Sequence, residues 1–566
     1  MYIAIPYFLC NNIIVVLYYI NIMKGGGFVL NTESQRKMKK FRIISLLLVL
    51  VIAVGLLTGC GEEEKPDNVV TWLTTMDNSP DNERIHKMFN EKLKAKTGCT
   101  VEFVSIDQSQ YDLRLASNEE FDLIYAPDHS GYWTNVAKDA FMPITEAEFK
   151  KYAPDIWALG KEQLDIAKYN GKYYAVPAIG DSWAADRIYA ARGDLMDKVG
   201  VESLNTIEDI DRYLMGVAEL NKKGETNIVP YNTNGGTGYM IFVMFAADWG
   251  WANPGSLSYA SHYYYDMFDP SYKLFKGIDT PQVKQYSDTV KKWYDAGVFS
   301  KSVLSSNESS EEQFRKGKSA LAWIGSPALG NVLLNDLKKM PEAKDWDVRL
   351  YSIYEKYQRA FNYINYGTAI GRNSKNKKNA LKVLNAVLTD EELYNLIQYG
   401  EKGVHYEITE AGYTPLKVSE KKTYTPPYVS IRNTNFDHKT KYDYAYAEDL
   451  VKELKNKTVN DPFVNCPILS SNDTDMQVKF TQLNDVYLEV SMARLYGAVD
   501  NVDAAIAKEK KALKDAGIDE YMKYVQRQMD AYKDSHSDAM KEFEANKKAV
   551  TEYLKANPNK TNPKDY

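Results

Sequence analysis

The segment that most restricts the fold of this chain runs from Asn68 to Pro127, where three apolar stretches alternate with helical patterns. The stretches read "NVVTWLTTMD", "CTVEFVSI" and "FDLIYAP", and the interval after the first carries apolar residues at helical spacing. Strands and helices that alternate through short links form a parallel sheet covered by helices. We therefore predict an open α/β sheet here, with ligands bound beyond the carboxyl ends of its strands.

Capping and turn residues mark the ends of several predicted elements. Ser79-Pro80 is typical of a helix start, and Gly98 is typical of a helix end. Asn170-Gly171 predicts a tight hairpin turn between aromatic strands. Thr206 and Asp209 have the spacing of a capping box before an amphipathic helix.

A second α/β pattern follows in the middle of the chain. The stretch "WAADRIYAARGDLMDKVG" begins extended and becomes helical, and "FRKGKSALAWIGSP" adds another strand. From residue 500 the pattern is helical, and the last stretch, to Tyr566, is polar and rich in lysine. We expect that last stretch to be an exposed or frayed helix.

An export signal precedes the α/β region. Lys39-Lys40 stands before the apolar run "FRIISLLLVLVIAVGLL", which is shorter than the ~20 residues that a comfortable membrane span needs. The run ends in Leu57-Thr58-Gly59-Cys60, which resembles the bacterial lipobox, whose cysteine carries diacylglycerol. The acidic residues after Cys60 are typical of a solvated tether. The alternative is a signal anchor with a chance cysteine.

A second apolar segment, residues 1–22, stands in front of this complete signal. Our hypothesis is a misplaced start, with the true first codon near Leu30 or Met38. The bases of the gene would test it through a purine-rich ribosome-binding sequence.

Composition narrows the class of function. Residues 1–59 carry six Lys or Arg and one Glu, so a chain starting at Cys60 has a net charge of about −11 rather than −6. An acidic surface argues against nucleic acid as a partner. The six histidines lack HExxH or HxxxH spacing, and the sequence has no Walker A, GxSxG or CxxC motif. We expect no metal and no cofactor, although a pair of glycosidase carboxylates stays open.

Several stretches, taken with the lipobox, carry a family resemblance. They are "GKYYAVP", "RGDLMDKVGVESLNTIEDI", "KGKSALAWIGSP", "GRNSKNKKNALKVLNAVLTDEELYNLIQYG", "QYGEKGVHYEI" and "LKDAGIDEYMKYVQRQMDAY". In this combination the chain resembles the extracellular solute-binding proteins of ABC importers, in the cluster that binds oligosaccharides. It looks like the lipoprotein branch with a helical C-terminal domain. The resemblance covers Asn68 to about Lys533.

The resemblance implies a fold and a function. The fold would be α/β, a two-lobe periplasmic-binding-protein-like fold with crossover hinge strands and an added helical C-terminus. The protein would capture an oligosaccharide between its lobes, deliver it to ABC permease subunits and catalyse nothing. We expect a monomer, anchored to the lipid bilayer through Cys60 on the outer face of the bacterial cell membrane.

The expected domain boundaries follow from these patterns. They are residues 1–59 for the extension and signal peptide, 60–67 for the tether, 68–186 and 368–425 for lobe 1, 187–367 and 470–535 for lobe 2 with its helical C-terminal part, and 536–566 for a polar helical tail. Crossings between the lobes are expected near Trp183–Arg192, near Phe361–Thr368 and between about Thr425 and Ser470.

Sugars have apolar CH faces and hydroxyl rims, so a sugar site needs aromatic platforms beside amides and carboxylates. Thirteen of the forty-five residues from Tyr231 to Phe275 are aromatic, more than twice the 13% share of the whole chain, which favours this region. Each such residue is also a candidate for the core, a cap or a turn. The candidate ligand-binding residues are Asp77, Asp128, Trp183, Tyr231, Asn234, Trp249, Trp251, Trp323 and Tyr366.

Two further expectations concern tryptophans and cysteines. Because Trp249 and Trp251 flank a glycine, we expect their rings to diverge, with one stacking on a sugar and the other packing inside the second lobe. Cys99 opens a strand of the first lobe and Cys466 lies in a late linker, so we expect both thiols to stay unpaired.

Two alternative functions remain open from the sequence. A secreted polysaccharide hydrolase or lyase would have a cleft of similar character and would turn its glycan over. A binding protein for peptides or other solutes is the second alternative, because aromatic, Asn and Asp content favours sugar only modestly.

Overall fold

Residues 68–566 are described by the computed structural model, apart from 77, 118, 170, 182–186, 235–239, 256–261, 411, 417–422, 467, 469–473 and 558–560. The predicted signal, the tether and Cys60 therefore lie outside the described residues, as do Asp77 and Trp183. No candidate for a membrane-spanning helix is found within the described ranges.

The first lobe is built on a five-stranded sheet with the order β2-β1-β3-β14-β6. Its strands are β1 (Val69–Thr74), β2 (Thr100–Ser105), β3 (Leu123–Tyr125), β6 (Val176–Pro177) and β14 (Gly367–Ile370). β1 runs parallel to β2 and β3, which confirms the prediction for this segment. β14 enters between β3 and β6 and is antiparallel to both, so the sheet is mixed.

Helices bury both faces of this sheet. They are α3 (Asn82–Thr97), α4 (Tyr111–Ala116), α5 (Tyr132–Ala137), α6 (Glu146–Tyr152), α7 (Pro154–Leu164), α15 (Lys377–Thr389) and α16 (Glu391–Tyr399). Successive residues of a strand point to opposite faces. Trp72 accordingly packs in one core with Phe89 of α3, while Leu73 packs in the other core with Tyr132 of α5.

The first helix starts later than its sequence signal predicts. The residue at its N-cap is Asp81, two residues after Ser79. The Ser79 hydroxyl is instead hydrogen-bonded to Thr425, so it is not available to cap the helix. The predicted helix end is confirmed, because Gly98 adopts a left-handed conformation with φ 75°.

The second lobe has a three-stranded antiparallel sheet at its centre. β7 (Ile188–Arg192) lies between β11 (Leu321–Ile324) and β12 (Val348–Ser352). The surrounding helices are α8 (Gly193–Val199), α9 (Ile207–Lys222), α12 (Pro281–Ala296), α13 (Ser310–Arg315), α14 (Pro327–Leu337) and α17 (Ala447–Asn456). The predicted capping box is confirmed, since Thr206 and Asp209 cap α9 reciprocally.

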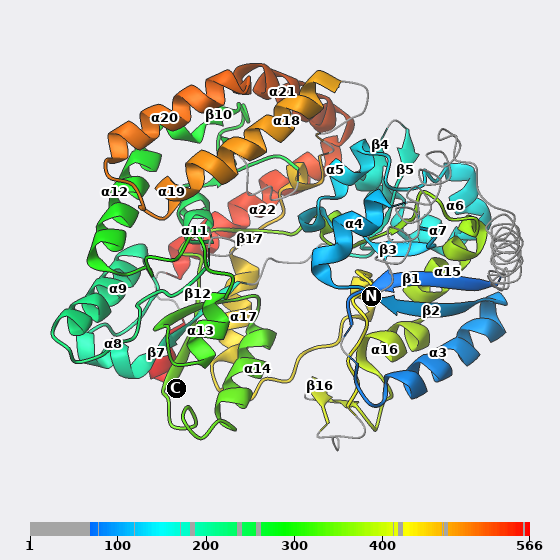
Figure 1. Cartoon of the computed structure of the whole chain (residues 1–566), viewed down its shortest axis with the longest axis horizontal. Helices are drawn as coiled ribbons and strands as arrows, with labels where there is room; N and C mark the ends of the chain where they lie inside the picture. The colour runs from blue at the N-terminus through cyan, green and yellow to red at the C-terminus, as the bar shows by residue number, and fades with distance from the viewer. Residues whose placement is uncertain are drawn as a thin grey trace, which may run out of the picture. The chain divides into compact units, whose positions relative to one another are not determined.

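A small second sheet and the C-terminal helices share another core of this lobe (Figure 1). The sheet consists of β8 (Trp251–Ala252), β9 (Tyr263–Asp266) and β10 (Phe275–Lys276), and α11 (Met240–Asp248) leads into it. The helical region contains α18 (Thr474–Val486), the π-helical turn η9 (Tyr487–Ser491), α19 (Met492–Leu495), α20 (Val502–Asp515), α21 (Ile518–Ser535) and α22 (Ser537–Ala556).

The last helix is less exposed than the sequence suggests. Its residues Phe543, Lys547 and Val550 are buried. The Lys547 ammonium donates to the carbonyl of Met267 at 2.7 Å and to the Tyr272 hydroxyl at 2.9 Å. α22 therefore packs on the second lobe, with polar and lysine side chains on its outer side.

The remaining described elements are short. They are η1 (Gln108–Gln110), η2 (Asp128–Ser130), η3 (Asp165–Ala167), β4 (Lys168–Tyr169), β5 (Lys172–Tyr173), η4 (Gly277–Asp279), β13 (Gln358–Arg359), η5 (Tyr363–Asn365), β15 (Tyr406–Thr409), β16 (Gly412–Pro415), η7 (Thr434–Phe436), β17 (Thr458–Val459), η8 (Pro462–Asn465) and η10 (Pro563–Asp565). β4 and β5 form the predicted hairpin. Cys99 and Cys466 are buried and unpaired, as expected.

Candidate functional site

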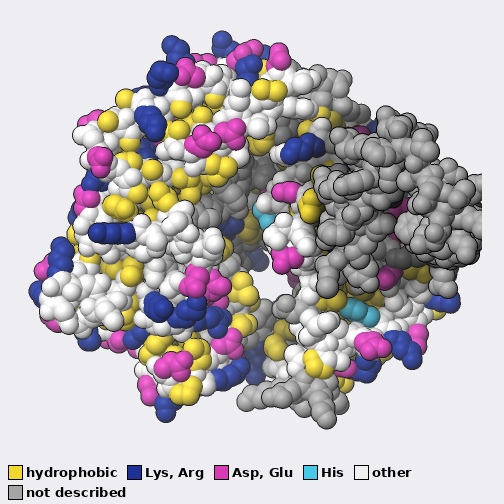
Figure 2. All heavy atoms as spheres, viewed as in Figure 1, with side chains coloured by type: hydrophobic (Ala, Val, Ile, Leu, Met, Phe, Trp, Pro, Cys, Tyr) yellow, Lys and Arg dark blue, Asp and Glu magenta, His cyan; other side chains and the backbone are white. Residues whose placement is uncertain are grey.

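The chain passes between the two lobes at three places within the described residues. It crosses between β6 and β7, between β13 and β14, and between β16 and α17. Figure 2, drawn from the same side as Figure 1, shows the surface hollowed between the elements of the two lobes. The crossings are the natural place for a ligand site, because side chains from both lobes meet there.

On the first lobe, the site begins at the carboxyl ends of β1 and β3. The Thr74 hydroxyl donates to the carbonyl of Tyr428 at 2.8 Å, which fixes the segment of the third crossing beside β1. The Tyr428 ring lies 5.2 Å from the ring of Tyr125, the last residue of β3. Its hydroxyl lies 3.4 Å from His129 Nε2.

The two tyrosine hydroxyls stay protonated at neutral pH. Burial raises the pKa of Tyr125 to about 12 and the pKa of Tyr428 to about 12. Both groups are therefore uncharged and can donate as well as accept hydrogen bonds. Such groups suit a ligand that carries hydroxyls better than one that carries charge.

Asp128 follows β3 and binds the second crossing. One of its carboxylate oxygens accepts from the Asn362 side-chain amide at 3.0 Å, and the other accepts from the backbone N–H of His129 at 2.7 Å. The Oδ1 atom of Asn362 is buried and has no hydrogen-bond partner among the described residues. Asp128 thus orients an amide whose acceptor atom is buried and not yet hydrogen-bonded among the described residues.

Aromatic and guanidinium groups line the second-lobe side. Arg187, directly before β7, holds its guanidinium carbon 5.6 Å from the Trp323 ring centre and 5.3 Å from the Phe361 ring centre. These distances are within the range of cation–π attraction. The Trp323 side chain is half-buried, and its indole N–H has no hydrogen-bond partner among the described residues.

A second such pair closes the site on the first lobe. The Arg432 guanidinium carbon lies 5.3 Å from the ring centre of Tyr366, and Arg432 also forms an ion pair with Asp437 at 2.7 Å. The half-buried Tyr366 ring interacts electrostatically with Tyr428. The crossing site, as we use the term, comprises Asp128, Arg187, Trp323, Phe361, Asn362, Tyr366, Tyr428 and Arg432.

The structure therefore brings three of the sequence candidates together, namely Asp128, Trp323 and Tyr366. It places Tyr231 in the core of the second lobe, fully buried, with its ring 6.3 Å from that of Tyr189. The Asn234 side chain donates to the carbonyl of Asn307 at 3.2 Å. These two residues support the second lobe rather than join the crossing site.

The tryptophan pair Trp249 and Trp251 does not diverge as expected. Gly250 adopts φ 78°, which turns the chain so that the two rings meet edge to face with centroids 4.7 Å apart. A Cβ atom at Gly250 would also lie 2.9 Å from the Phe268 ring. Both the positive φ angle and the lack of space beside Phe268 therefore require glycine at this position. Trp251 is 8% exposed and packs in the core, as expected for one member of the pair, whereas Trp249 is half-buried.

Sequence reasoning missed Arg187, Phe361, Asn362, Tyr428 and Arg432. All five lie inside the expected crossings, which was the signal available. An arginine or asparagine in a loop is usually a solvated residue, so composition alone does not mark it. Within the described ranges, no cluster of three His, Cys, Asp or Glu side chains could hold a metal ion.

Two α/β lobes with three crossings and a site where the crossings meet define a two-lobe ligand-binding protein. The sequence profile of the bacterial extracellular solute-binding proteins matches residues 77–393, more than half of the chain. The chain therefore belongs to the bacterial extracellular solute-binding protein family, which confirms the resemblance found in the sequence. A profile for a domain of unknown function, DUF3502, matches residues 470–534.

Individual relatives agree with this assignment. A carbohydrate ABC transporter substrate-binding protein of Streptococcus pneumoniae is 25% identical over 386 residues, which is 66% of this chain and 74% of the relative. The N-glycan transport solute-binding protein NgtS of Streptococcus pneumoniae, solved with Man5GlcNAc, is 22% identical with a TM-score of 0.61. The match covers 83% of this chain and 99% of NgtS.

Two more solved structures have the same fold. The alginate-binding protein AlgQ2 is 17% identical with a TM-score of 0.60, over 82% of this chain and 97% of AlgQ2. The Streptococcus pneumoniae protein FusA, solved with kestose, is 16% identical with a TM-score of 0.58, over 82% of this chain and 100% of FusA. At these identities the likeness establishes the two-lobe fold.

Proposed function

We propose that this protein captures an oligosaccharide at the crossing site and delivers it to the permease of an ABC importer. In this proposal the chain is held on the outer face of the cell membrane by a lipid on Cys60. It is a receptor and performs no catalytic step.

The observation that carries the proposal is the half-buried Trp323 beside Arg187 and Phe361. A flat aromatic face matches the CH face of a sugar ring. The indole N–H of Trp323 and the Oδ1 of Asn362 are buried without a hydrogen-bond partner among the described residues, so a shift that uncovers them would let them pair with sugar hydroxyls. The neutral hydroxyl of the half-buried Tyr428, beside His129 Nε2, adds a further hydrogen-bonding group.

The relatives support the carbohydrate part of the proposal. One is a carbohydrate ABC transporter substrate-binding protein, and NgtS and FusA were solved with Man5GlcNAc and kestose. The two ligands are different sugars. We therefore take the ligand class, and not a particular sugar, from this comparison.

The first experiment titrates the protein, from Asn68 onward, with oligosaccharides of several classes while the mixtures are analysed for products. Mannose-containing N-glycans, fructo-oligosaccharides and alginate oligosaccharides form the panel, with tripeptides and pentapeptides as controls. We expect heat of binding with one glycan class and no change in its chain length. Turnover of a bound glycan would favour the hydrolase alternative, and binding of peptides alone would favour the second alternative.

The lipid anchor has its own test. We expect Cys60→Ser to leave the protein unprocessed or to release it from the membrane fraction, because the lipidated thiol is lost. Cys99→Ser is the matched control, since that thiol is buried in the first lobe. A Cys60→Ser variant that fractionates and migrates like the unchanged protein would contradict the anchor.

A further inference from the structure

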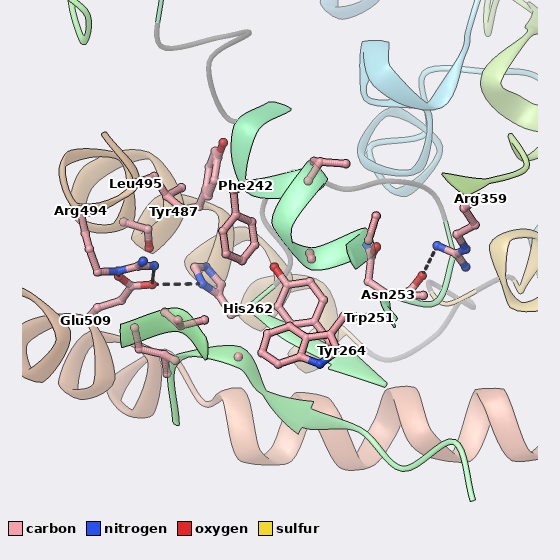
Figure 3. A pocket seen from close by; sticks show the side chains of 18 of the residues that line it. Phe242, Trp251, Asn253, His262, Tyr264, Arg359, Tyr487, Arg494, Leu495 and Glu509 are labelled. Atoms are coloured by element: carbon pink, nitrogen blue, oxygen red, sulfur yellow. Dashed lines mark hydrogen bonds and ion pairs between the residues drawn. The ribbon is translucent and has the colours of Figure 1, made fainter. Parts of the chain in front are cut away.

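A cavity of about 110 Å³ lies in the second lobe, and none of the residues that line it belongs to the crossing site. One wall comes from α11, β8, β9 and η4, which lie in the part matched by the solute-binding family. The other wall comes from η9, α19 and α20, which lie in the part matched by the domain of unknown function (Figure 3). The lobe 2 cavity, as we call it, thus lies where these two parts of the chain meet.

Most of the wall is apolar and aromatic. Trp251 and Tyr264 lie side by side with ring centres 5.5 Å apart, and Phe242 lies 6.1 Å from Tyr264. Gly277 makes this packing possible, because a Cβ atom there would lie 2.7 Å from the Tyr264 ring. The π-helical turn Tyr487–Ser491 lines the opposite side, and π-helical turns are frequent at functional sites.

One end of the cavity is polar and fully buried. The Arg494 guanidinium donates to both carboxylate oxygens of Glu509, at 2.6 and 3.0 Å, and to the Ser287 hydroxyl at 3.1 Å. Burial disfavours the charged carboxylate, but the adjacent Arg494 holds the pKa of Glu509 below its ordinary value. The ion pair is therefore internally neutral and leaves no net charge for a ligand to balance.

His262 adds an acceptor next to this pair. Its Nε2 atom lies 3.1 Å from the carbonyl oxygen of Leu483, an acceptor, so Nε2 carries the proton. Burial lowers the pKa of His262, which keeps the ring neutral and leaves Nδ1 with a lone pair. Nδ1 faces Glu509 Oε1 at 3.8 Å, which is longer than a hydrogen bond. Figure 3 marks this contact with a dashed line.

Two acceptors that face each other define a place for a donor. The ring of His262 is 7% exposed and Glu509 is 1% exposed, so bulk water does not reach them freely. The other charged group in the described wall, Arg359, already donates to the carbonyl of Asn253 at 2.6 Å and pairs with Asp461 at 2.6 Å. The His262–Glu509 gap is thus the polar feature that a guest would use.

We propose that the lobe 2 cavity binds a small uncharged ring compound that carries one hydroxyl or amino group. The ring would lie against Trp251, Tyr264 and Phe242, and the donor would approach from the cavity and hydrogen-bond to His262 Nδ1, with Glu509 Oε1 as a second acceptor for an amino group. An apolar cavity of ~150 Å³ engineered in another protein binds benzene, so this volume is of the right order for one ring. It is far too small for an oligosaccharide. Binding here would give the domain of unknown function a ligand of its own.

The test uses the chain from Asn68 onward and three probes of similar size, namely phenol, aniline and toluene. Ligand-observed NMR titration gives the affinity of each probe. We expect dissociation constants on the order of 0.1 to 1 mM for phenol and aniline, because the ligands are small. Toluene, which lacks the donor, should bind about 3- to 10-fold more weakly.

Two variants locate the binding. Ala246→Leu places extra side-chain volume at the cavity wall and should abolish binding of all three probes. His262→Leu removes one acceptor and should weaken phenol and aniline about 3- to 10-fold while leaving toluene unchanged. His438→Leu, a histidine of the first lobe that contacts Asn395, is the matched control and should change nothing.

The comparison of probes on the unchanged protein keeps the proposal falsifiable even if a variant does not fold. Toluene that binds as tightly as phenol would overturn the role of the acceptor pair. Absence of binding by all three probes up to 10-fold above the expected range would overturn the cavity as a ligand site, with ordered water as its content. Oligosaccharide binding should be the same with and without phenol, which separates this test from that of the proposed function.

Discussion

The crossing site and the lobe 2 cavity use the same kinds of side chain in opposite ways. In the crossing site Arg187 and Arg432 lie over half-buried aromatic rings, and hydrogen-bonding atoms of Trp323 and Asn362 lack partners among the described residues. In the cavity Arg494 donates to both carboxylate oxygens of Glu509, and the aromatic rings pack against one another. We infer from this difference that the crossing site is suited to a large ligand. The lobe 2 cavity instead stabilises the second lobe and has room only for a small ligand.

The buried ion pair should give the largest effect on stability. Arg494→Leu leaves Glu509 buried without its counter-charge, and we expect the free energy of unfolding to fall by about 3 to 5 kcal/mol. Urea unfolding followed by tryptophan fluorescence measures it. The matched control is Lys284→Leu, whose pair with Asp288 lies at the surface and should change the stability far less. Equal losses in the two variants would remove the distinction between interior and surface.

The tryptophan pair Trp249 and Trp251 tests which ring belongs to the interior. Trp251→Ala should lower the free energy of unfolding by about 3 to 5 kcal/mol, because a large buried side chain is lost. Trp249→Ala should cost less, since that ring is half-buried. Thermal melting and calorimetry with the identified glycan compare the two variants. A loss of glycan affinity in Trp249→Ala with unchanged stability would make Trp249 a stacking platform and extend the ligand site beyond the crossing site.

The crossing site should show its effect in binding rather than in stability. Trp323→Ala removes an aromatic platform, and we expect a loss of about 1 to 3 kcal/mol of binding free energy, by analogy with base stacking on aromatic side chains. That corresponds to roughly 5- to 150-fold in affinity. Calorimetry with the identified glycan measures it. Trp157→Ala, a half-buried tryptophan of the first lobe that packs beside Lys150, is the control and should bind normally.

The smallest expected change in the free energy of unfolding comes from neutralising an exposed carboxylate, that of Asp197. Hydrogen bonds from Arg349 and then Lys564 lower the pKa of Asp197 from 3.8 to about 2. A depressed pKa in the folded state means that the stabilisation is present above the unfolded pKa and is lost as the pH falls toward 2. Because the side chain is 50% exposed, we expect Asp197→Asn to cost only about 0.5 kcal/mol at pH 6.

Chemical unfolding across a range of pH checks this dependence. The stabilities of Asp197→Asn and the unchanged protein should converge as the pH approaches 2. Asp538→Asn, at an exposed carboxylate of α22, is the control. A constant difference between pH 6 and pH 2 would show that the effect of Asp197 is not electrostatic.

Local patterns in the sequence predicted much of the fold and little of the site. The parallel strands β1 to β3, the capping box of Thr206 and the hairpin before β6 all depend on residues close together in the chain. The contact between Asp128 and Asn362 joins residues 234 positions apart, and the contact between His262 and Leu483 spans 221 positions. No spacing rule links residues so distant, so these arrangements appear only when the lobes are folded.

The place of β14 in the first sheet has a consequence for how the chain is made. β14 lies between β3 and β6, yet about 240 residues separate Tyr125 from Gly367 along the chain. At a synthesis rate of ~5 to 20 residues per second, the ribosome needs on the order of 10 to 50 s to bridge that interval. The amino-terminal strands have no β14 beside them during that time, so the first sheet can be completed only after residue 370 has been synthesised.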